Sequence, residues 1–307
     1  MLDVHRLRLL RELAYRGTIA AVAQSMAYTP SAVSQQLTAL EREAGVPLLE
    51  RTGRRVRLTA AARTLVAHAE EVLARLEEAE AALAAARQNL IGTLRVGAFP
   101  SAARTILPPA LVALGRDHPG LELMVEEFDP ALAGEAVRTG ELDVALTQDY
   151  DLVPAPERAA LTSTVVLTDP MLVASTRPPL DPAEPVASFR GGWWVLGRPG
   201  SLCRLAAERI CQSAGFQPRV RHQTDDFPTA LALVAADQGQ ALLPRLGAVN
   251  APAGITLTPL PVRTRVSVTH RRGAGTHPAT AAFREAIAHA VDGYLAIAAL
   301  ASPAAAR

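Results

Sequence analysis

The segment from residue 60 to residue 91 contains neither glycine nor proline, and Thr59 in front of it can cap a helix. Two apolar series of period seven run through it, offset by four residues: Leu65, Val72, Ala79 and Ala86, and Ala69, Leu76, Leu83 and Leu90. This 4-3 spacing, kept over about four heptads, is typical of a coiled-coil seam. An isolated helix would leave the stripe in water, so we expect a dimerisation helix over 60–91 that pairs with a second copy of the chain. The expected contact positions are Leu65, Val72, Leu76 and Leu83.

Before this helix, the chain has the pattern of three short helices separated by stop signals. Apolar residues recur at helical spacing from residue 3 to about 15, from 18 to 26 and from 30 to 43. Gly17 ends the first stretch, Thr29-Pro30 separates the second from the third, and Gly45 ends the third. Three helices with a tight turn before the last are typical of a helix-turn-helix unit.

A basic hairpin is expected after the third helix. Thr52-Gly53 is a turn signal, and apolar residues alternate with arginines beyond it, which predicts two short strands. The candidate DNA-binding residues of this wing are Arg51, Arg54 and Arg55. Residues 1–58 carry nine arginines against five acidic residues, a net charge of +4, whereas the whole chain carries +1. The chain has no lysine, so every basic contact falls to arginine, which binds phosphate and guanine with paired hydrogen bonds.

The third helix carries an uncharged polar stripe opposite its apolar face. Its members, at spacing 0, 3, 4 and 7, are Ser31, Ser34, Gln35 and Thr38. Glutamine can read adenine with two hydrogen bonds, serine and threonine can contact more than one base, and a recognition helix presents such a face to the major groove. A merely solvated face is the alternative, although such a face usually mixes charged residues. Together with the wing and the dimerisation helix, the stripe indicates double-stranded DNA as a partner.

After Gly92 the pattern changes to alternating strands and helices, which predicts an α/β domain with parallel-sheet units. The expected strands are 93–98, 121–128, 142–147, two within 164–175, 193–196, 219–224, 241–244, 255–260 and 265–270. An alanine-rich helix from Ala279 closes the domain.

Ligands of such domains gather beyond the carboxyl ends of the strands. The candidate effector-binding residues at those positions are Phe99, Pro100, Ser101, Ala102, Thr147, Gln148, Arg198, Ser201, Thr224 and Asp225. The Ser101 hydroxyl and the amides beside it are suited to a carboxylate or another anion. For each residue taken singly, an alternative stays open: Ser101 and Thr224 only cap helices, and Asp225 only solvates a loop.

Other classes of protein find little support in the residues. Cys203 and Cys211 lie roughly 12 Å apart along a helix, too far for a disulfide, so we interpret them as buried free thiols, with redox sensing as the alternative. No nucleophile elbow, dinucleotide-binding loop or metal-ligand spacing is present, so no enzyme, metal or cofactor is expected. The start of the chain lacks a secretion signal and the apolar runs are short, which favours a cytoplasmic protein without a membrane partner. An exported solute-binding protein would explain residues 93–300 but would leave the first 90 without a role.

The stretch TIAAVAQSMAYTPSAVSQQLTALEREAGVPLLERTGRRVRLT (18–59) resembles the helix-turn-helix of LysR-type transcriptional regulators. The resemblance continues through the linker helix and at residues 92–97, 106–123, 140–146 and 241–245. It implies a winged DNA-binding domain over 2–59, a linker and dimerisation helix over 60–91, and an effector-binding domain over 93–300. That last domain would have two lobes like a type 2 periplasmic solute-binding protein, lobe I at about 93–164 with 265–300 and lobe II at about 165–264. The resemblance also implies that dimers join into a tetramer and that a small molecule bound between the lobes modulates promoter binding.

Two departures from the family pattern are informative. Many members have Gly-x-Gly before the strand at 241–244, whereas this chain has Asp237-Gln238-Gly239-Gln240. Gln35 occupies a position often filled by arginine, which shifts the expected base preference from guanine toward adenine.

Overall fold

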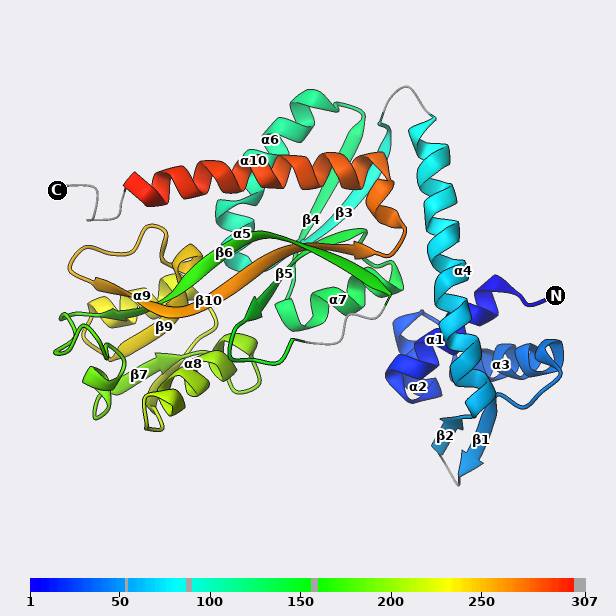
Figure 1. Ribbon diagram of the computed structural model, residues 1–307, viewed down its shortest axis with the longest axis horizontal. Coiled ribbons are helices and arrows are strands. Elements are labelled where there is room, and N and C mark those ends of the chain that lie inside the picture. Colours follow the sequence, from blue (N-terminus) through cyan, green and yellow to red (C-terminus); the bar gives the residue numbers. More distant parts are fainter. Residues whose placement is uncertain (53–54, 87–89, 156–159, 301–307) are drawn as a thin grey trace. The chain divides into compact units, whose positions relative to one another are not determined.

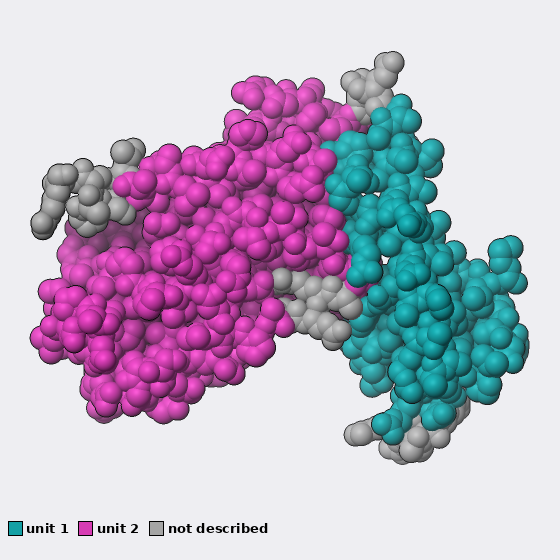
Figure 2. All heavy atoms as spheres, viewed as in Figure 1, with its two compact units in different colours: residues 1–88, 271–278 teal, residues 89–270, 279–307 magenta. Residues whose placement is uncertain are grey.

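The computed structural model describes residues 1–52, 55–86, 90–155 and 160–300, of which residues 51, 52, 55 and 300 are described by their backbone alone. The chain divides into two compact units, residues 1–88 with 271–278 and residues 89–270 with 279–307 (Figure 2). Each unit buries its own cluster of hydrophobic side chains. The N-terminal and C-terminal parts of the chain are therefore built on separate cores.

The first unit begins with three helices, as expected: α1 (Val4–Arg16), α2 (Ile19–Ser25) and α3 (Pro30–Ala44). Thr18 and Thr29 each accept a hydrogen bond from the backbone amide three residues ahead, at 3.2 Å in both cases. Gly17 and Gly45 end α1 and α3 in the left-handed conformation, with φ of 72° and 69°, which glycine adopts without a steric penalty. Local capping chemistry thus fixes the boundaries of these helices.

The wing is an antiparallel pair, β1 (Leu49–Thr52) and β2 (Arg55–Leu58), in the register Leu49↔Leu58 to Thr52↔Arg55. One carboxylate oxygen of Glu41, near the end of α3, accepts hydrogen bonds from the backbone amides of Leu48 (2.9 Å) and Leu49 (3.0 Å). The start of the wing is therefore tied to the third helix.

The long helix α4 spans Ala60–Ala85, and Thr59 caps it by accepting from the Ala62 amide at 3.1 Å. It ends earlier than the predicted residue 91. Residues 87–89 lie outside the described residues, and Leu90 lies outside any helix. The prediction relied on the lack of glycine and proline before Gly92, but a permissive composition does not by itself fix where a helix ends. The last position of the predicted seam is consequently not on the helix.

A short segment far along the chain completes the first unit. The 3-10 turn η3 (Ala274–Thr276) contacts α4, and the Arg271 Nε atom lies 2.6 Å from a carboxylate oxygen of Glu77. At Gly273, with φ of 92°, a Cβ atom would come within 2.2 Å of the Ala74 carbonyl oxygen. Only glycine permits this approach to the helix.

The second unit contains an eight-stranded mixed sheet in the order β4-β3-β5-β10-β6-β9-β7-β8. The strands are β3 (Gly92–Ala98), β4 (Leu121–Glu127), β5 (Val144–Tyr150), β6 (Leu161–Ser175), β7 (Trp193–Leu196), β8 (Arg219–Gln223), β9 (Gln240–Pro244) and β10 (Thr256–Arg271). The expected parallel units are present, because β3 pairs with β4 and β5, and β7 pairs with β8 and β9, in parallel. In contrast, β10 is antiparallel to β5 and β6 is antiparallel to β9.

The two central strands correct the sequence interpretation. Residues 164–175 form part of one strand of 15 residues, and residues 255–270 fall almost entirely within one strand of 16, where two pairs of shorter strands were predicted (Figure 1). The prediction broke them at Asp169-Pro170 and at Pro261. Proline is tolerated where a strand needs no ladder donor, and the Asp169 carboxylate is satisfied by hydrogen bonds, so neither feature ends a strand here.

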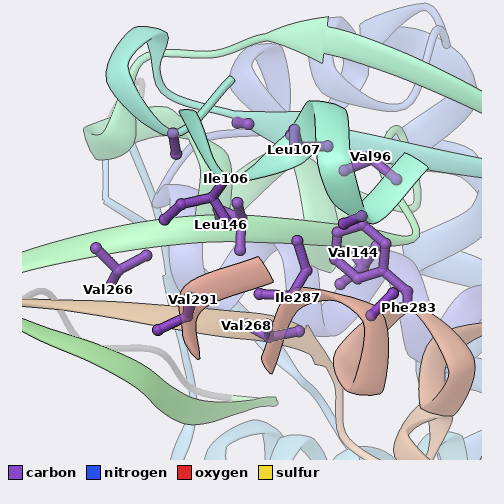
Figure 3. Packing of buried hydrophobic residues seen from close by; sticks show 14 of the residues in the cluster. Val96, Ile106, Leu107, Val144, Leu146, Val266, Val268, Phe283, Ile287 and Val291 are labelled. Atoms are coloured by element: carbon purple, nitrogen blue, oxygen red, sulfur yellow. The ribbon is translucent and has the colours of Figure 1, made fainter. Parts of the chain in front are cut away.

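The helices divide between the two ends of the sheet, which gives the expected two-lobed α/β domain. Lobe I has β3, β4 and β5 with the helices α5 (Pro100–Thr105), α6 (Leu107–Asp117), α7 (Pro130–Thr139) and α10 (Pro278–Leu300). Lobe II has β7, β8 and β9 with α8 (Leu202–Ser213) and α9 (Phe227–Ala235). In the core of lobe I, Phe283, Ile287 and Val291 of α10 pack with Val144 and Val268 of the sheet (Figure 3).

Candidate functional sites

The polar stripe of α3 lies on its accessible side. Ser31 and Gln35 are exposed, Ser34 and Thr38 are half-buried, and the opposite residues Val33, Leu37 and Leu40 are buried. Ser31 Oγ lies 3.0 Å from Thr29 Oγ1, so its hydroxyl already has a neighbour at the helix start. The stripe is therefore available to a partner along its length, apart from one intramolecular hydroxyl contact.

Two adjacent glutamines of α3 have different environments. The Gln36 side-chain oxygen accepts a hydrogen bond from Arg6 Nε at 2.9 Å, and Arg6 also pairs with Glu43. Gln35 is exposed and has no hydrogen-bond partner among the described residues. The Gln36 amide therefore makes a contact within the protein, whereas the Gln35 amide is accessible to an external ligand.

Of the predicted wing contacts, Arg54 lies outside the described residues. Arg51 and Arg55 are placed by backbone register only, opposite Val56 and Thr52. The structure accordingly describes the hairpin that carries these arginines but not where their side chains lie.

The apolar stripe of α4 is only partly covered within its own unit. Leu65 packs against the core of the three-helix unit, and Leu76 is half-buried. Val72 is 44% exposed and Leu83 is 71% exposed. The N-terminal end of the predicted seam is therefore used within the chain, and its later positions remain accessible.

A cavity of about 260 Å³ lies between the two lobes. Its walls come from the carboxyl ends of β3, β4 and β5 in lobe I and from the starts of α8 and α9 and the end of β8 in lobe II. The lining residues are Phe99, Pro100, Ser101, Glu127, Phe128, Asp129, Pro130, Gln148, Tyr150, Ser201, Leu202, Cys203, Asp225 and Phe227. This is where ligands of open α/β sheets are expected.

The cavity collects six of the ten predicted effector-binding residues: Phe99, Pro100, Ser101, Gln148, Ser201 and Asp225. The other four lie elsewhere. Ala102 is buried in the core of lobe I, and the exposed Arg198 side chain lies 3.8 Å from Asp225 without lining the cavity. Thr224 lines a separate cavity of about 10 Å³, and its hydroxyl accepts the Asp226 amide hydrogen at 3.1 Å.

Thr147, the fourth of these, belongs to a hydroxyl cluster within the sheet. Its Oγ1 lies 2.8 Å from Thr269 Oγ1 of β10, which in turn lies 2.9 Å from Ser163 Oγ of β6. Alternation along β5 explains the difference between Thr147 and Gln148, because successive side chains point to opposite faces.

Three hydrogen-bonding side chains of the cavity differ in how they are satisfied. Ser101 is 3% exposed, and its Oγ is buried without a hydrogen-bond partner among the described residues. The Gln148 amide, 2% exposed, accepts from Tyr150 Oη at 3.1 Å and donates to Thr264 Oγ1 at 3.5 Å. Burial raises the pKa of Tyr150 well above its ordinary value, so the phenol stays protonated and acts as the donor. Ser101 therefore stands out as the cavity hydroxyl that still lacks a partner.

Sequence reasoning missed the last residue of β4, Glu127, and the segment after it, which supplies Phe128, Asp129 and Pro130 to the cavity. Glu127 pairs with Ala98 in the ladder, and the Phe128 amide donates to the Ala98 carbonyl at 2.9 Å, which brings this strand end beside Ser101. The same rule that selected the ends of the other strands would have found it. The prediction named single residues at the strand ends and left out residues one or two positions away, namely Tyr150, Leu202, Cys203 and Phe227.

The two cysteines are free thiols, as predicted. Cys211 is buried and Cys203 is partly exposed at the cavity wall. Burial raises the pKa of each thiol to about 12. Both are therefore protonated near neutral pH and are poor nucleophiles.

Within the described ranges, no cluster of histidine, cysteine and acidic side chains is arranged to hold a metal ion. Among the helices in those ranges, none has the length and apolar character needed to cross a membrane.

Two family models match the chain. Residues 4–63 match the bacterial regulatory helix-turn-helix protein of the lysR family, and residues 87–292 match the LysR substrate binding domain. The second match alone spans more than half of the chain.

Individual proteins agree with these matches. The transcriptional dual regulator GltC of Bacillus subtilis strain 168 is 28% identical over 247 residues, which cover 79% of this chain and 81% of GltC. Full-length OxyR from Pseudomonas aeruginosa has a similar structure, with a TM-score of 0.59 at 23% identity, over 94% of this chain and 95% of that chain. CbnR in complex with its target DNA gives a TM-score of 0.51 at 21% identity, over 94% of this chain and 100% of that one. At these identities the two solved structures show a shared fold.

Proposed function

The chain belongs to the LysR family of transcriptional regulators, and we propose from that premise that it reads promoter DNA with the polar stripe of α3 and binds its effector in the cavity between the lobes. Two separate observations carry this proposal. Gln35 is exposed on the third helix without a hydrogen-bond partner among the described residues, and the Ser101 hydroxyl is buried in the cavity wall without one. Each is a hydrogen-bonding group that the described residues leave unsatisfied. A buried group without a partner, such as the Ser101 hydroxyl, is typical of a site that binds something else, and the exposed Gln35 amide is accessible to base edges.

Ser31, Ser34, Gln35 and Thr38 are the proposed base contacts, and Arg51, Arg54 and Arg55 of the wing are the proposed phosphate contacts. The similar CbnR structure is a complex with target DNA, and it supports DNA as the partner by likeness. Short hydroxyls and one amide suit base edges, while arginines suit the backbone. A cytoplasmic location agrees with this role, and no catalytic activity is proposed.

We further propose that two copies of the chain pair along α4, with Val72, Leu76 and Leu83 at the contact. The support is the accessible apolar stripe, which is costly to leave in water. Leu65 contributes mainly to its own unit, so the contact begins one heptad later than the spacing suggested. Association of two such dimers through the effector domains is part of the same proposal.

The reading face is tested by a matched pair of variants. Gln35→Ala should weaken binding to the intergenic DNA beside the chain's own gene by about 1–3 kcal/mol and spare non-specific binding. Gln36→Ala is the control, because its side chain bonds Arg6 inside the fold and should affect stability more than DNA preference. Gel shifts with specific and scrambled duplexes measure both. If Gln35→Ala retained full preference for the specific duplex, the proposed reading face would be wrong.

A further inference from the structure

The cavity between the lobes carries acidic groups but no basic ones. Glu127, Asp129 and Asp225 line it, and no arginine or histidine is among its described lining residues. Two arginines near the cavity already form ion pairs with acidic side chains: Arg198 lies 3.8 Å from Asp225, and Arg104 lies 3.4 Å from Asp226. An anionic effector would therefore enter a cavity that offers it no free counter-charge.

The three carboxylates differ in what they already contact. One oxygen of Asp129 accepts the Ala131 amide hydrogen at 2.8 Å, and one of Asp225 accepts the Arg198 amide hydrogen at 2.9 Å. Glu127 is exposed at the end of β4, and its carboxylate has neither a hydrogen bond nor an ion pair among the described residues. Of the three carboxylates, that of Glu127 is therefore the one most available to form an ion pair with a bound cation.

Three of the four helices that begin at the cavity, α7, α8 and α9, do not reverse this balance, while the fourth, α5, has only six residues and no side-chain cap. The positive ends of α7, α8 and α9 would favour an anion if they were open. Each is already capped by a side-chain oxygen: Asp129 on the Ala131 amide, Ser201 on the Arg204 amide at 3.3 Å, and Asp226 on the Thr229 amide at 3.0 Å. Two of the three caps are carboxylates, which bring negative charge of their own.

The remaining walls suit an organic cation. Phe99, Phe128, Tyr150 and Phe227 provide aromatic surface, and an aromatic face attracts a nearby cation. Ser101 contributes a buried hydroxyl oxygen without a partner, which can accept a hydrogen bond from an ammonium group. A volume of about 260 Å³ restricts the occupant to a small molecule.

Resting on the proposed effector role of this cavity, we propose that the effector is a small organic cation, a protonated amine with an apolar body. Glu127 supplies the counter-charge, Ser101 Oγ accepts an ammonium hydrogen, and the aromatic walls hold the body. This departs from the expectation that Ser101 would hold an anion, because the cavity that surrounds Ser101 is acidic.

The test uses the full-length chain and three probes of similar shape but different charge: benzylamine, benzyl alcohol and benzoate. Calorimetric titration and thermal shift at matched ionic strength measure binding, and gel shift measures any change in DNA affinity. Benzylamine should bind at least tenfold more tightly than benzoate. Glu127→Gln should reduce benzylamine affinity about tenfold, as expected for losing roughly 1.4 kcal/mol.

The control is Glu126→Gln, which removes the adjacent carboxylate of β4 that does not line the cavity, and which should leave benzylamine affinity unchanged. Both variants should melt like the parent chain without ligand, because both side chains are exposed. Tighter binding of benzoate, or equal loss of affinity in both variants, overturns the cation assignment but leaves the effector cavity in place. If no probe of either charge changes the melting temperature or the DNA affinity, the cation assignment and the effector role of the cavity both fail.

Discussion

Asp169 lies fully buried in the middle of β6 and bonds three donors from other parts of the chain. Its carboxylate accepts from Arg245 Nε at 3.1 Å, from the Leu246 amide at 2.6 Å and from Tyr294 Oη at 3.3 Å. The first two donors belong to the segment after β9 and the third to α10. Asp169 therefore joins the central strand to two elements on its flanks, and its substitution should destabilise the whole C-terminal unit.

Asp169→Ala leaves these three donors without their acceptor. Breaking one side of a buried ion pair costs about 3–5 kcal/mol, and an unsatisfied buried donor costs about 1–3 kcal/mol. The Arg245 side chain is 32% exposed and can regain water, which reduces its share of the loss. We expect the free energy of unfolding to fall by about 3–4 kcal/mol. Urea unfolding followed by tryptophan fluorescence measures this directly, because the two tryptophans of the chain, Trp193 and Trp194, lie in the C-terminal unit.

Asp169→Asn separates charge from hydrogen bonding. Burial raises the pKa of Asp169, and the Leu246 amide, Arg245 and Tyr294 only partly offset this. An acid with a raised pKa in the folded state contributes its full stability below its unfolded pKa, about 3.9, and loses it as pH rises through the folded value. Asparagine does not titrate, so the deficit of Asp169→Asn relative to the parent chain should shrink as pH rises from 4 to 7. A deficit that grows over this range would refute the reasoning.

Three further predictions concern dimerisation, DNA affinity and thiol chemistry. Leu83→Glu should dissociate the dimer at micromolar concentration in sedimentation velocity, whereas Ala85→Glu, exposed but off the seam, should not; a dimeric Leu83→Glu variant would contradict the contact. Arg54→Ala and Arg55→Ala should each weaken specific and non-specific DNA binding alike and reduce the slope of log affinity against log salt by about one, and unchanged slopes in gel shifts would exclude these phosphate contacts. With a pKa of about 12, Cys203 is thiolate in only about one molecule in ten thousand at pH 8, so iodoacetamide and hydrogen peroxide should modify the native chain far more slowly than the unfolded one. Equal modification rates by mass spectrometry would revive the redox alternative.

The features that the sequence predicted well depend on local chemistry. Thr18, Thr29 and Thr59 cap helices because a threonine hydroxyl reaches the amide three residues ahead, and Gly17 and Gly45 end helices because glycine adopts positive φ. The position of six effector candidates in one cavity follows from a general property of α/β sheets, which needs only the strand ends.

The features that were missed depend on distant partners. Whether β6 continues through Asp169-Pro170 is decided by Arg245 and Tyr294, which lie far along the chain. The exposure of Leu83 but not of Leu65 is decided by packing in the three-helix unit, since both residues are seam positions of the heptad pattern. The acidic character of the cavity likewise required all of its walls to be assembled before the charges could be compared.

The continuous central strands also constrain the order in which the chain is completed during synthesis. The segments that form lobe II are contiguous in the sequence between β6 and β10, so they leave the ribosome one after another. Lobe I cannot close at the same stage, because Phe283, Ile287 and Val291 of its core belong to α10, which is translated after all of lobe II. The nascent chain therefore holds β3, β4 and β5 with an unfilled core while lobe II is being made. Premature termination before α10 would leave that apolar surface permanently uncovered, and such fragments should depend on chaperones.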